Sequence, residues 1–314
     1  MKKKSPSKDL QSFTKLMRFE SLAYQYAWHG YRGSQILWSF CNKFLGGSRY
    51  FPSQVLLLPS GFIIRYQAKD WTKRTIYQGT YERALLHFLN SLKLNDLVID
   101  VGANIGVTLW HSLKNSGSKA TYLAFEPSIQ CISDLEFTGN QISNTGKIFK
   151  YALGESDTTQ RLYGVNNEKH SGLASLIKSD SQVGDSHIVQ VRKLDTVLDG
   201  EGLRGKISLL KIDTEGYEGS ILSGAHKLLK SRKVEILILE VSPHLSELTY
   251  LENLYEILGD AYIWFMIEEV GVFHRQPKLR KISHTEATTS NFQFNLAIVR
   301  SDRVEVYVRD TFLA

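Results

Sequence analysis

A doubly wound α/β fold with a parallel sheet is predicted by three features of this 314-residue chain. An apolar run at 97–101 leads directly into a glycine-bearing turn and then into a helix pattern. Further runs typical of buried strands occur at 121–125, 148–153, 207–212 and 234–240. The last two are separated by apolar residues at helical spacing, namely Ile221, Leu222, Ala225, Leu228 and Leu229. We therefore expect a strand, helix, strand unit with a right-handed crossover.

Two additions are expected ahead of this core. Residues 20–45 are aromatic and apolar without being continuous, which favours helices that cover a domain face. The alternative is an interfacial segment that touches lipid or the acceptor substrate. The runs at 55–58 and 62–66 flank a short glycine-containing turn and predict a hairpin. Helical spacing from Tyr81 to Leu92 then predicts a helix before the first core strand.

The rest of the chain continues the alternation. Residues 128–140 predict a helix after the second core strand. Three apolar runs near the end of the chain are interpreted as the antiparallel strands that close the sheet: 262–267, 291–299 and 304–308. The length suits one large domain with additions. We place a helical and hairpin extension at 1–78 and the main α/β domain at 79–314.

The turn after the first core strand has the features of a nucleotide-cofactor cradle. Gly102 and Gly106 allow positive φ angles and a close approach of the backbone to a ligand. The spacing Gly102-x-Asn104-x-Gly106 lacks the third glycine of the dinucleotide fingerprint, which disfavours a pyrophosphate ligand. Glu126 ends the second core strand, where a carboxylate can accept hydrogen bonds from both hydroxyls of a ribose. The pair indicates an adenosine-type cofactor, although a purely structural glycine and acid is the alternative.

Two motifs in this order resemble the FkbM family of S-adenosylmethionine-dependent methyltransferases: Val98–Gly106 and Leu210–Glu218. Further matches are Tyr81-Glu82, Phe125-Glu126-Pro127, Ala152-Leu153-Gly154, Leu194-Asp195, Leu222-Ser223-Gly224-Ala225 and Leu239-Glu240. The resemblance covers about residues 79–241. It implies a class I methyltransferase (Rossmann-like) fold with a mostly parallel seven-stranded sheet, S-adenosylmethionine over the strand ends, and a hydroxyl as methyl acceptor. Thr214 and Tyr217 depart from the family pattern without replacing a group needed for the cofactor.

The cofactor site implied by this resemblance gathers residues that follow several strands, because ligands of such sheets bind outside the carboxyl ends of the strands. Its expected members are Glu82, Asp100, Gly102, Ala103, Asn104, Gly106, Glu126, Pro127, Ala152, Leu153 and Asp213. Glu82 is expected to reach the amino group of the cofactor, and Leu153 to border its adenine.

Charged residues after the strand at 207–212 are the candidates for chemistry. Lys211, Asp213 and Glu215 alternate, so they point to one side while the chain is extended. One interpretation is structural: a salt bridge, with Asp213 or Thr214 capping the next helix. In the functional interpretation Asp213 faces the sulfonium or the acceptor hydroxyl, and Glu215 and Glu240 orient the acceptor or remove its proton. We expect the catalytic set to be Lys211, Asp213, Glu215 and Glu240 without a metal, although oxygen ligands around a divalent cation are an alternative.

Composition restricts partners and location. The formal net charge is +6, but the basic residues are dispersed apart from clusters at 1–4 and 278–281, so no nucleic-acid partner is predicted. Cys41 and Cys131 do not indicate a disulfide framework, which fits a reducing cytoplasm. The chain has no stretch of eighteen apolar residues, so no membrane span is expected. Among the histidines, His170 is the candidate for an acceptor-side base, but a solvated side chain is the more common case.

The predicted function is a cytoplasmic O-methyltransferase that uses S-adenosylmethionine and acts on a hydroxyl of a sugar, glycolipid or secondary metabolite. One alternative is a nicotinamide-dependent dehydrogenase, which binding of NAD would distinguish. The other is a non-catalytic scaffold whose aromatic N-terminal segment is the interaction surface, a role that the retained Asp213, Glu215 and Glu126 disfavour.

Overall fold

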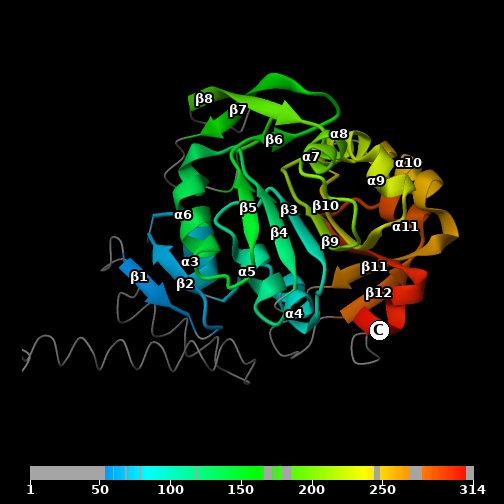
Figure 1. Cartoon of the computed structure of the whole chain (residues 1–314), viewed down its shortest axis with the longest axis horizontal. Helices are drawn as coiled ribbons and strands as arrows, with labels where there is room; N and C mark the ends of the chain where they lie inside the picture. The colour runs from blue at the N-terminus through cyan, green and yellow to red at the C-terminus, as the bar shows by residue number, and fades with distance from the viewer. Residues whose placement is uncertain are drawn as a thin grey trace, which may run out of the picture. The chain divides into compact units, whose positions relative to one another are not determined.

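The computed structural model describes residues 54–58, 60–67, 69–77, 79–117, 119–165, 172, 174–178, 185–243, 248–268 and 278–308. The chain divides into two compact units, one of residues 1–81 with 270–275 and the other of residues 82–269 with 276–314. Figure 1 labels the elements of both. The helices expected at 20–45 and the candidate His170 lie outside the described residues. Within the described ranges, every helix is too short or too polar to span a lipid bilayer.

The described part of the first unit is a hairpin followed by a helix. β1 (Gln54–Leu57) and β2 (Ile63–Tyr66) pair antiparallel, which confirms the predicted hairpin. Gly61 turns the chain between them with a φ of 91°, a conformation that costs glycine little. α3 (Trp71–Tyr77) follows β2 in this unit.

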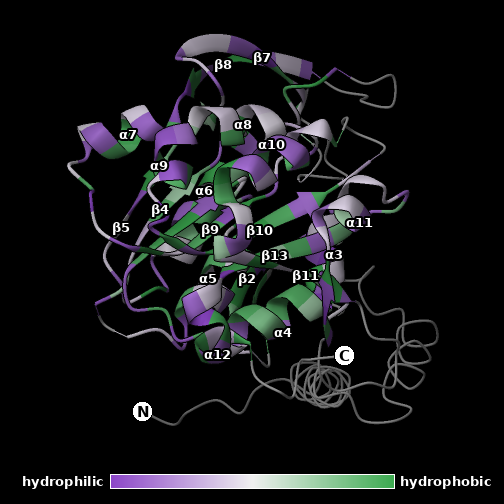
Figure 2. Ribbon diagram, turned by 90° about the vertical axis from the view of Figure 1, so that its right-hand side faces the viewer, coloured by the Kyte–Doolittle hydropathy of each residue, from purple (hydrophilic) through white to green (hydrophobic). Residues whose placement is uncertain are grey.

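An eight-stranded sheet forms the centre of the second unit. Its strands, in spatial order, are β12 (Lys278–Ile282), β11 (Tyr262–Glu268), β13 (Phe294–Arg300), β10 (Val234–Val241), β9 (Ile207–Ile212), β3 (Leu97–Val101), β4 (Thr121–Phe125) and β5 (Gly146–Phe149). The five strands from β10 to β5 are parallel, and β13, β11 and β12 extend the sheet antiparallel. The strands are the most apolar elements of Figure 2, as expected where helices cover both faces.

Helices lie on both faces of this sheet (Figure 1). One group is α4 (Arg83–Ser91), α5 (Val107–Leu113) and α6 (Ile129–Gly139). The other is α7 (Leu194–Gly200), α8 (Glu218–Gly224), α9 (His226–Lys230), α10 (Thr249–Leu258) and α11 (His284–Thr288). The second group shares one hydrophobic cluster with the strands, in which Ile212 and Leu239 are fully buried. This arrangement confirms the predicted doubly wound α/β fold.

A separate small sheet lies between β5 and β9 in the sequence. It consists of β6 (Ala152–Leu153), β8 (Asp185–Arg192) and β7 (Thr158–Val165), in that spatial order. β8 runs parallel to β6 and antiparallel to β7. The small sheet has a hydrophobic cluster of its own, formed by Ala152, Leu162, Val165, Val189 and Val191.

Two expectations about the main sheet are corrected by its pairing. It has eight strands instead of seven, because residues 278–282, interpreted as a basic cluster, pair with β11 as an edge strand. The single strand expected at 148–153 is two strands in different sheets. β5 ends at Phe149, and Ala152 pairs with Val191 of the small sheet. An apolar run specifies an extended chain without specifying which neighbour it pairs with.

A third expectation fails at the end of the described chain. Residues 304–308 alternate like a strand, but Val304–Tyr307 form the short helix α12, directly after the 3-10 turn η3 (Ser301–Arg303). Another 3-10 turn, η2 (Gly259–Ala261), lies between α10 and β11. In the conformation of α12 the Tyr307 hydroxyl donates to the buried carboxylate of Glu235 at 2.6 Å. A tertiary hydrogen bond of this kind overrides the local alternation.

Candidate functional site

The turn after β3 is built around a glycine that touches another loop. Gly102 has a φ of 75°, and its N–H donates to the carbonyl of Phe125 at 3.0 Å. A Cβ on Gly102 would lie 1.8 Å from the carbonyl oxygen of Asp213, so no other residue fits there. Asn104 and Gly106 also have positive φ angles, of 51° and 85°. The chain therefore stays tightly curled until α5 begins.

Glu126 holds this turn from the end of β4. Its Oε2 accepts from the N–H of Asn104 and its Oε1 from the N–H of Ser128, both at 2.8 Å. Burial raises the pKa of the Glu126 carboxyl to about 7, although the two N–H groups lower it. Each oxygen of a carboxylate can accept a second hydrogen bond. The position is therefore compatible with the ribose contact predicted from the sequence.

A buried ion-pair network joins β3 and β9. The Lys211 Nζ lies 2.9 Å from the Asp213 carboxylate and 3.5 Å from that of Asp100. The Thr108 hydroxyl also donates to Asp100, at 2.9 Å. Burial opposes the charge of Lys211, but Asp213, Asp100 and Glu82 outweigh it and raise the pKa of its ammonium. The salt bridge of the structural interpretation is therefore present, with Asp213 as one of its partners.

The loop from Asp213 to Tyr217 is closed by the first residue of the helix that follows it. α8 begins at Glu218, and neither Asp213 nor Thr214 caps it, which contradicts the capping alternative. The Glu218 Oε1 accepts from the Thr214 N–H at 2.8 Å, the Thr214 hydroxyl at 3.0 Å and the Gly216 N–H at 3.3 Å. The carboxylate thus bends the loop back onto its own helix.

Glu215 lies within this loop in a strained backbone conformation. Its φ is 55°, which is uncommon for a residue with a Cβ. Burial raises the pKa of its carboxyl to about 7, and the charges of Asp213 and Glu218 act in the same direction. A carboxyl with this pKa exchanges its proton near neutral pH, which is the property required of a general base.

Glu240 is the third carboxyl at this edge of the sheet. The parallel register of β9 and β10 puts it beside Asp213. Its Oε1 accepts from the side-chain amide of Gln293, and its Oε2 has no hydrogen-bond partner among the described residues. Burial, and then Asp213, Glu215 and Glu82, raise the pKa of Glu240 to about 10. The group therefore carries a proton at neutral pH and can donate a hydrogen bond, which favours the orienting role over proton removal.

The other residues expected at the cofactor lie in four places along the chain. Glu82 precedes α4 with a φ of 37°, and its charge acts on both Lys211 and Glu240, so it belongs to the same electrostatic group. Pro127 lies between β4 and α6, next to Glu126, and Ala103 is buried in the turn after β3. Ala152 and Leu153 are buried in the small sheet, outside the main sheet where they were expected.

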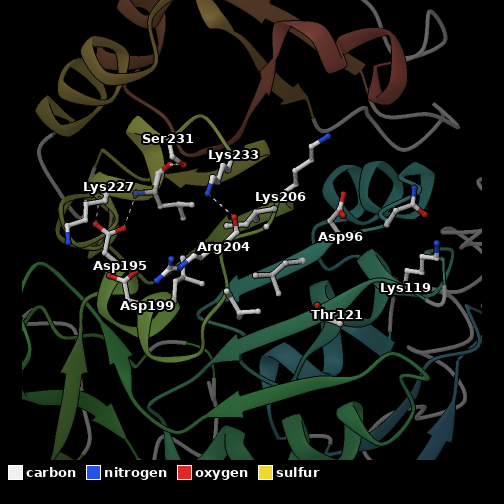
Figure 3. Close-up of a pocket in the computed structure, with 17 residues that line it drawn as sticks. Asp96, Lys119, Thr121, Asp195, Asp199, Arg204, Lys206, Lys227, Ser231 and Lys233 are labelled. Atoms are coloured by element: carbon white, nitrogen blue, oxygen red, sulfur yellow. Dashed lines mark hydrogen bonds between the residues drawn. The ribbon is translucent and has the colours of Figure 1, made fainter.

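Neither a metal cluster nor the described cavity coincides with these carboxyls. In the described ranges, no three His, Cys, Asp or Glu side chains are arranged to hold a metal ion. A cavity of about 510 Å³ opens at the opposite ends of the strands, where β3, β4 and β9 begin (Figure 3). It is lined by the strand residues Leu97, Thr121 and Ile207 and rimmed by Lys119, Arg204, Lys206, Lys227 and Lys233.

A comparison with known protein families covers the glycine turn and the loop that carries Asp213. The model of the methyltransferase FkbM domain matches residues 100–269, which is more than half of the chain. The match spans β3, β9 and β10, which supply Asp100, Lys211 and Glu240. No curated protein matches.

Among solved structures, several methyltransferases align with most of this chain. One is a protein from Streptococcus mutans, titled as a SAM-dependent methyltransferase, with 8% identity over 79% of this chain and a TM-score of 0.43; the chain spans 56% of its length. Another is a SAM-dependent methyltransferase from Agrobacterium tumefaciens, with 11% identity, 80% and 70% coverage and a TM-score of 0.39. A third is a ribosomal protein L11 methylase from Lactobacillus delbrueckii, with 13% identity, 73% and 79% coverage and a TM-score of 0.34.

The family match thus runs from the last residues of β3, through the loop that carries Asp213 and Glu215, to the end of β11. This chain belongs to the FkbM family of S-adenosylmethionine-dependent methyltransferases.

Proposed function

We propose that the protein transfers a methyl group from S-adenosylmethionine to a hydroxyl of a sugar, glycolipid or secondary metabolite. The observation that carries this proposal is the excess of carboxyls over cations beside the glycine turn. Among the described residues, the Lys211 ammonium pairs with Asp100 and Asp213 and acts on Glu82 and Glu215. Glu240 faces three of these acids, Asp213, Glu215 and Glu82. The cofactor carries a sulfonium and an ammonium against one carboxylate, so its net positive charge complements this group.

The residues present fit the cofactor in shape as well as in charge. The backbone is curled by positive φ angles at Gly102, Asn104 and Gly106, a conformation in which main-chain groups can approach a ligand closely. Glu126 is proposed to accept from the ribose hydroxyls through the lone pairs that its two backbone N–H partners leave free. Glu82 is proposed to bind the amino group, and Leu153 to border the adenine.

Bound S-adenosylmethionine supplies an electrophilic methyl group. As the bond from the acceptor oxygen to this methyl forms and its bond to sulfur breaks, the acceptor hydroxyl must lose a proton. Glu215 is the proposed base, because its pKa of about 7 matches the operating pH. Asp213 is engaged by Lys211, and protonated Glu240 is proposed to orient the acceptor. The sulfonium charge disappears while the Glu215 carboxylate is neutralised, so the total charge of the site stays constant.

Cofactor binding is the first test. Calorimetric titration with S-adenosylmethionine should show saturable binding that NAD does not reproduce. Glu126→Ala removes a charge-assisted pair of hydrogen bonds and should weaken binding by roughly ten- to a hundredfold. The matched control is Glu256→Ala, an exposed glutamate on α10, which should bind like the wild type. Preference for NAD, or no binding of S-adenosylmethionine, would overturn the proposal.

The acceptor class is tested by the chemistry of the product. Cofactor labelled in its methyl group is incubated with the enzyme and with fractions of sugars, glycolipids and small metabolites. A methyl ether resists mild alkali, whereas a methyl ester is hydrolysed. Label that is stable to alkali and released only by ether cleavage is the expected result, and label on a carboxyl or an amine would exclude a hydroxyl acceptor.

We also propose that the catalytic domain spans 79–314 and that the extension at 1–78 contacts the acceptor or a membrane through its aromatic segment. A truncation lacking residues 1–48 should still bind the cofactor but lose binding to the acceptor or to lipid vesicles. Wild-type activity together with wild-type vesicle binding would remove this role.

A further inference from the structure

Side chains of the small sheet and its surroundings reach the loop that carries Glu215. The Ser175 hydroxyl donates to the carbonyl oxygen of Glu215 at 2.9 Å. Two residues further along, the hydroxyl of Tyr217 accepts from the side-chain amide of Gln160 on β7 at 2.7 Å. The loop from 213 to 217 is therefore bonded to a segment outside the main sheet as well as to its own helix.

Ser175 is held in a fixed place by β7. It pairs with Tyr163 through both backbone groups, at 2.9 and 3.2 Å, and it is buried. Its hydroxyl oxygen accepts from the N–H of Ile177 at 3.0 Å. Because one lone pair is engaged in this way, the hydroxyl hydrogen is left to point at the carbonyl of Glu215.

The two sides of the Glu215 residue are thus restrained by different elements. Glu218 binds the N–H groups of Thr214 and Gly216, and Ser175 binds the carbonyl of Glu215 itself. A non-glycine residue in the left-handed region costs of order 1–3 kcal/mol and persists only where the surroundings hold it. The conformation of Glu215 consequently needs contacts of this kind.

We propose that Ser175 is a positioning residue, which holds Glu215 in its left-handed conformation and so lets the small sheet set the geometry of the base. This inference rests on the proposed function only for the role of Glu215 as a base. The hydrogen bond from Ser175 to the Glu215 carbonyl, which we call the clamp, is a property of the fold. Because Ser175 pairs with Tyr163 of β7, a ligand that shifts the small sheet should also shift Glu215.

An isosteric pair of variants isolates the hydroxyl. Ser175→Thr and Ser175→Val have nearly the same volume, and only the first keeps a donor toward Glu215. Loss of one such hydrogen bond, about 1 kcal/mol, predicts roughly fivefold faster hydrogen exchange at the amides of residues 215–217 in the valine variant. The threonine variant should exchange like the wild type. Ser175→Ala repeats the loss without added volume.

The matched control is Ser186→Ala on β8, whose hydroxyl accepts from Arg161 at 3.0 Å. It should leave exchange in the 213–217 loop unchanged. Equal exchange in the threonine and valine variants would overturn the clamp, whether or not the protein has methyltransferase activity. If the isosteric pair does not fold, the comparison of Ser175→Ala with the control decides in the same way.

The link to the base is tested by the pH profile of methyl transfer. The valine variant should lower kcat more than it changes KM, and it should move the apparent pKa of the limb near neutral pH, whereas the threonine variant restores both. Faster exchange with an unmoved profile would overturn the positioning of the base. A wild-type enzyme that transfers no methyl group contradicts the proposed function instead, and the exchange experiment still decides on the clamp.

Discussion

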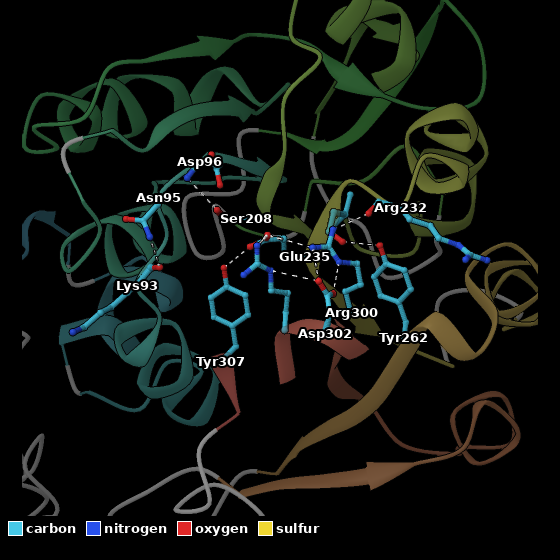
Figure 4. Close-up of polar contacts among 12 residues, drawn as sticks. Lys93, Asn95, Asp96, Ser208, Arg232, Glu235, Tyr262, Arg300, Asp302 and Tyr307 are labelled. Carbon is cyan, nitrogen blue, oxygen red and sulfur yellow. Dashed lines mark hydrogen bonds and ion pairs between the residues drawn. The ribbon is translucent and has the colours of Figure 1, made fainter. Parts of the chain in front are cut away.

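Strand β10 carries two buried glutamates in opposite surroundings. Glu235, near the start of the strand, accepts from the Tyr307 hydroxyl at 2.6 Å. It also lies 2.8 Å from the guanidinium of Arg303 and 3.5 Å from that of Arg300 (Figure 4). Glu240, near the end of the same strand, is bonded to the amide of Gln293 and faces other carboxyls.

The difference separates a carboxylate that is paired with cations from a carboxyl that faces other acids. Burial costs both side chains their hydration, and a buried acid either finds a cation or keeps its proton. At the start of β10 the protein supplies the cations itself, from η3 and the end of β13. At the end of the strand Glu240 faces other carboxyls and keeps its proton.

The largest effect, on the rate of methyl transfer, is expected at Glu215, the proposed base at the carboxyl ends of the strands. Glu215→Gln keeps the size of the side chain but cannot take up a proton, and we expect methyl transfer to fall by roughly 10²–10⁴-fold. Binding of S-adenosylmethionine should change far less. Initial rates of S-adenosylhomocysteine formation and calorimetry on the same sample measure both. A variant with the wild-type rate would remove Glu215 from the mechanism, and Glu256→Gln is the matched control.

At the N-terminal end of β10, where Glu235 lies, a substitution should instead lower the stability of the protein. Glu235→Gln leaves two guanidiniums without their buried counter-charge, and breaking such a pair costs about 3 kcal/mol. For a chain of this size the melting temperature should fall by roughly 5 °C. Binding of the cofactor to the folded fraction should be unaffected. A variant that melts with the wild type would mean that the two ends of β10 do not differ in this way.

The third effect is a gain in stability for Glu240→Gln, opposite in sign to the loss expected for Glu235→Gln. Because the pKa of Glu240 is raised to about 10, the native state holds this proton more tightly than the unfolded chain between about pH 4.5 and 10. The free energy of unfolding therefore falls as the pH rises through this window, and Glu240→Gln removes that fall. We expect the variant to match the wild type near pH 4.5 and to be the more stable protein at pH 8. Urea unfolding at the two pH values measures this, and a loss of stability at pH 8 would make Glu240 resemble Glu235.

The parts of the fold that were predictable are those in which sequence and environment are both local. The bounds of β4 and β9 coincide with the predicted runs at 121–125 and 207–212, because parallel strands buried on both faces are continuously apolar. The splitting of 148–153 and the helix at 304–307 depend on partners far away in the sequence. Periodicity carries no information about such partners.

The same division holds in the site. Asp100, Asp213 and Glu240 were predictable together, because residues that end neighbouring parallel strands meet at one edge. Gln293 and Ser175 were not. Each acts through a single contact to a residue 53 or 40 positions away, and neither belongs to a local pattern.

The contact between Gly102 and the Asp213 carbonyl also bears on protein engineering. The α-carbon of one loop rests on the backbone of the other, with no room for a methyl group between them. The two loops therefore depend on each other, because a change in the backbone of either one disturbs its contact with the other. A designer who grafts this cofactor cradle onto another scaffold must move both loops together, and a library that randomises one of them should keep position 102 fixed.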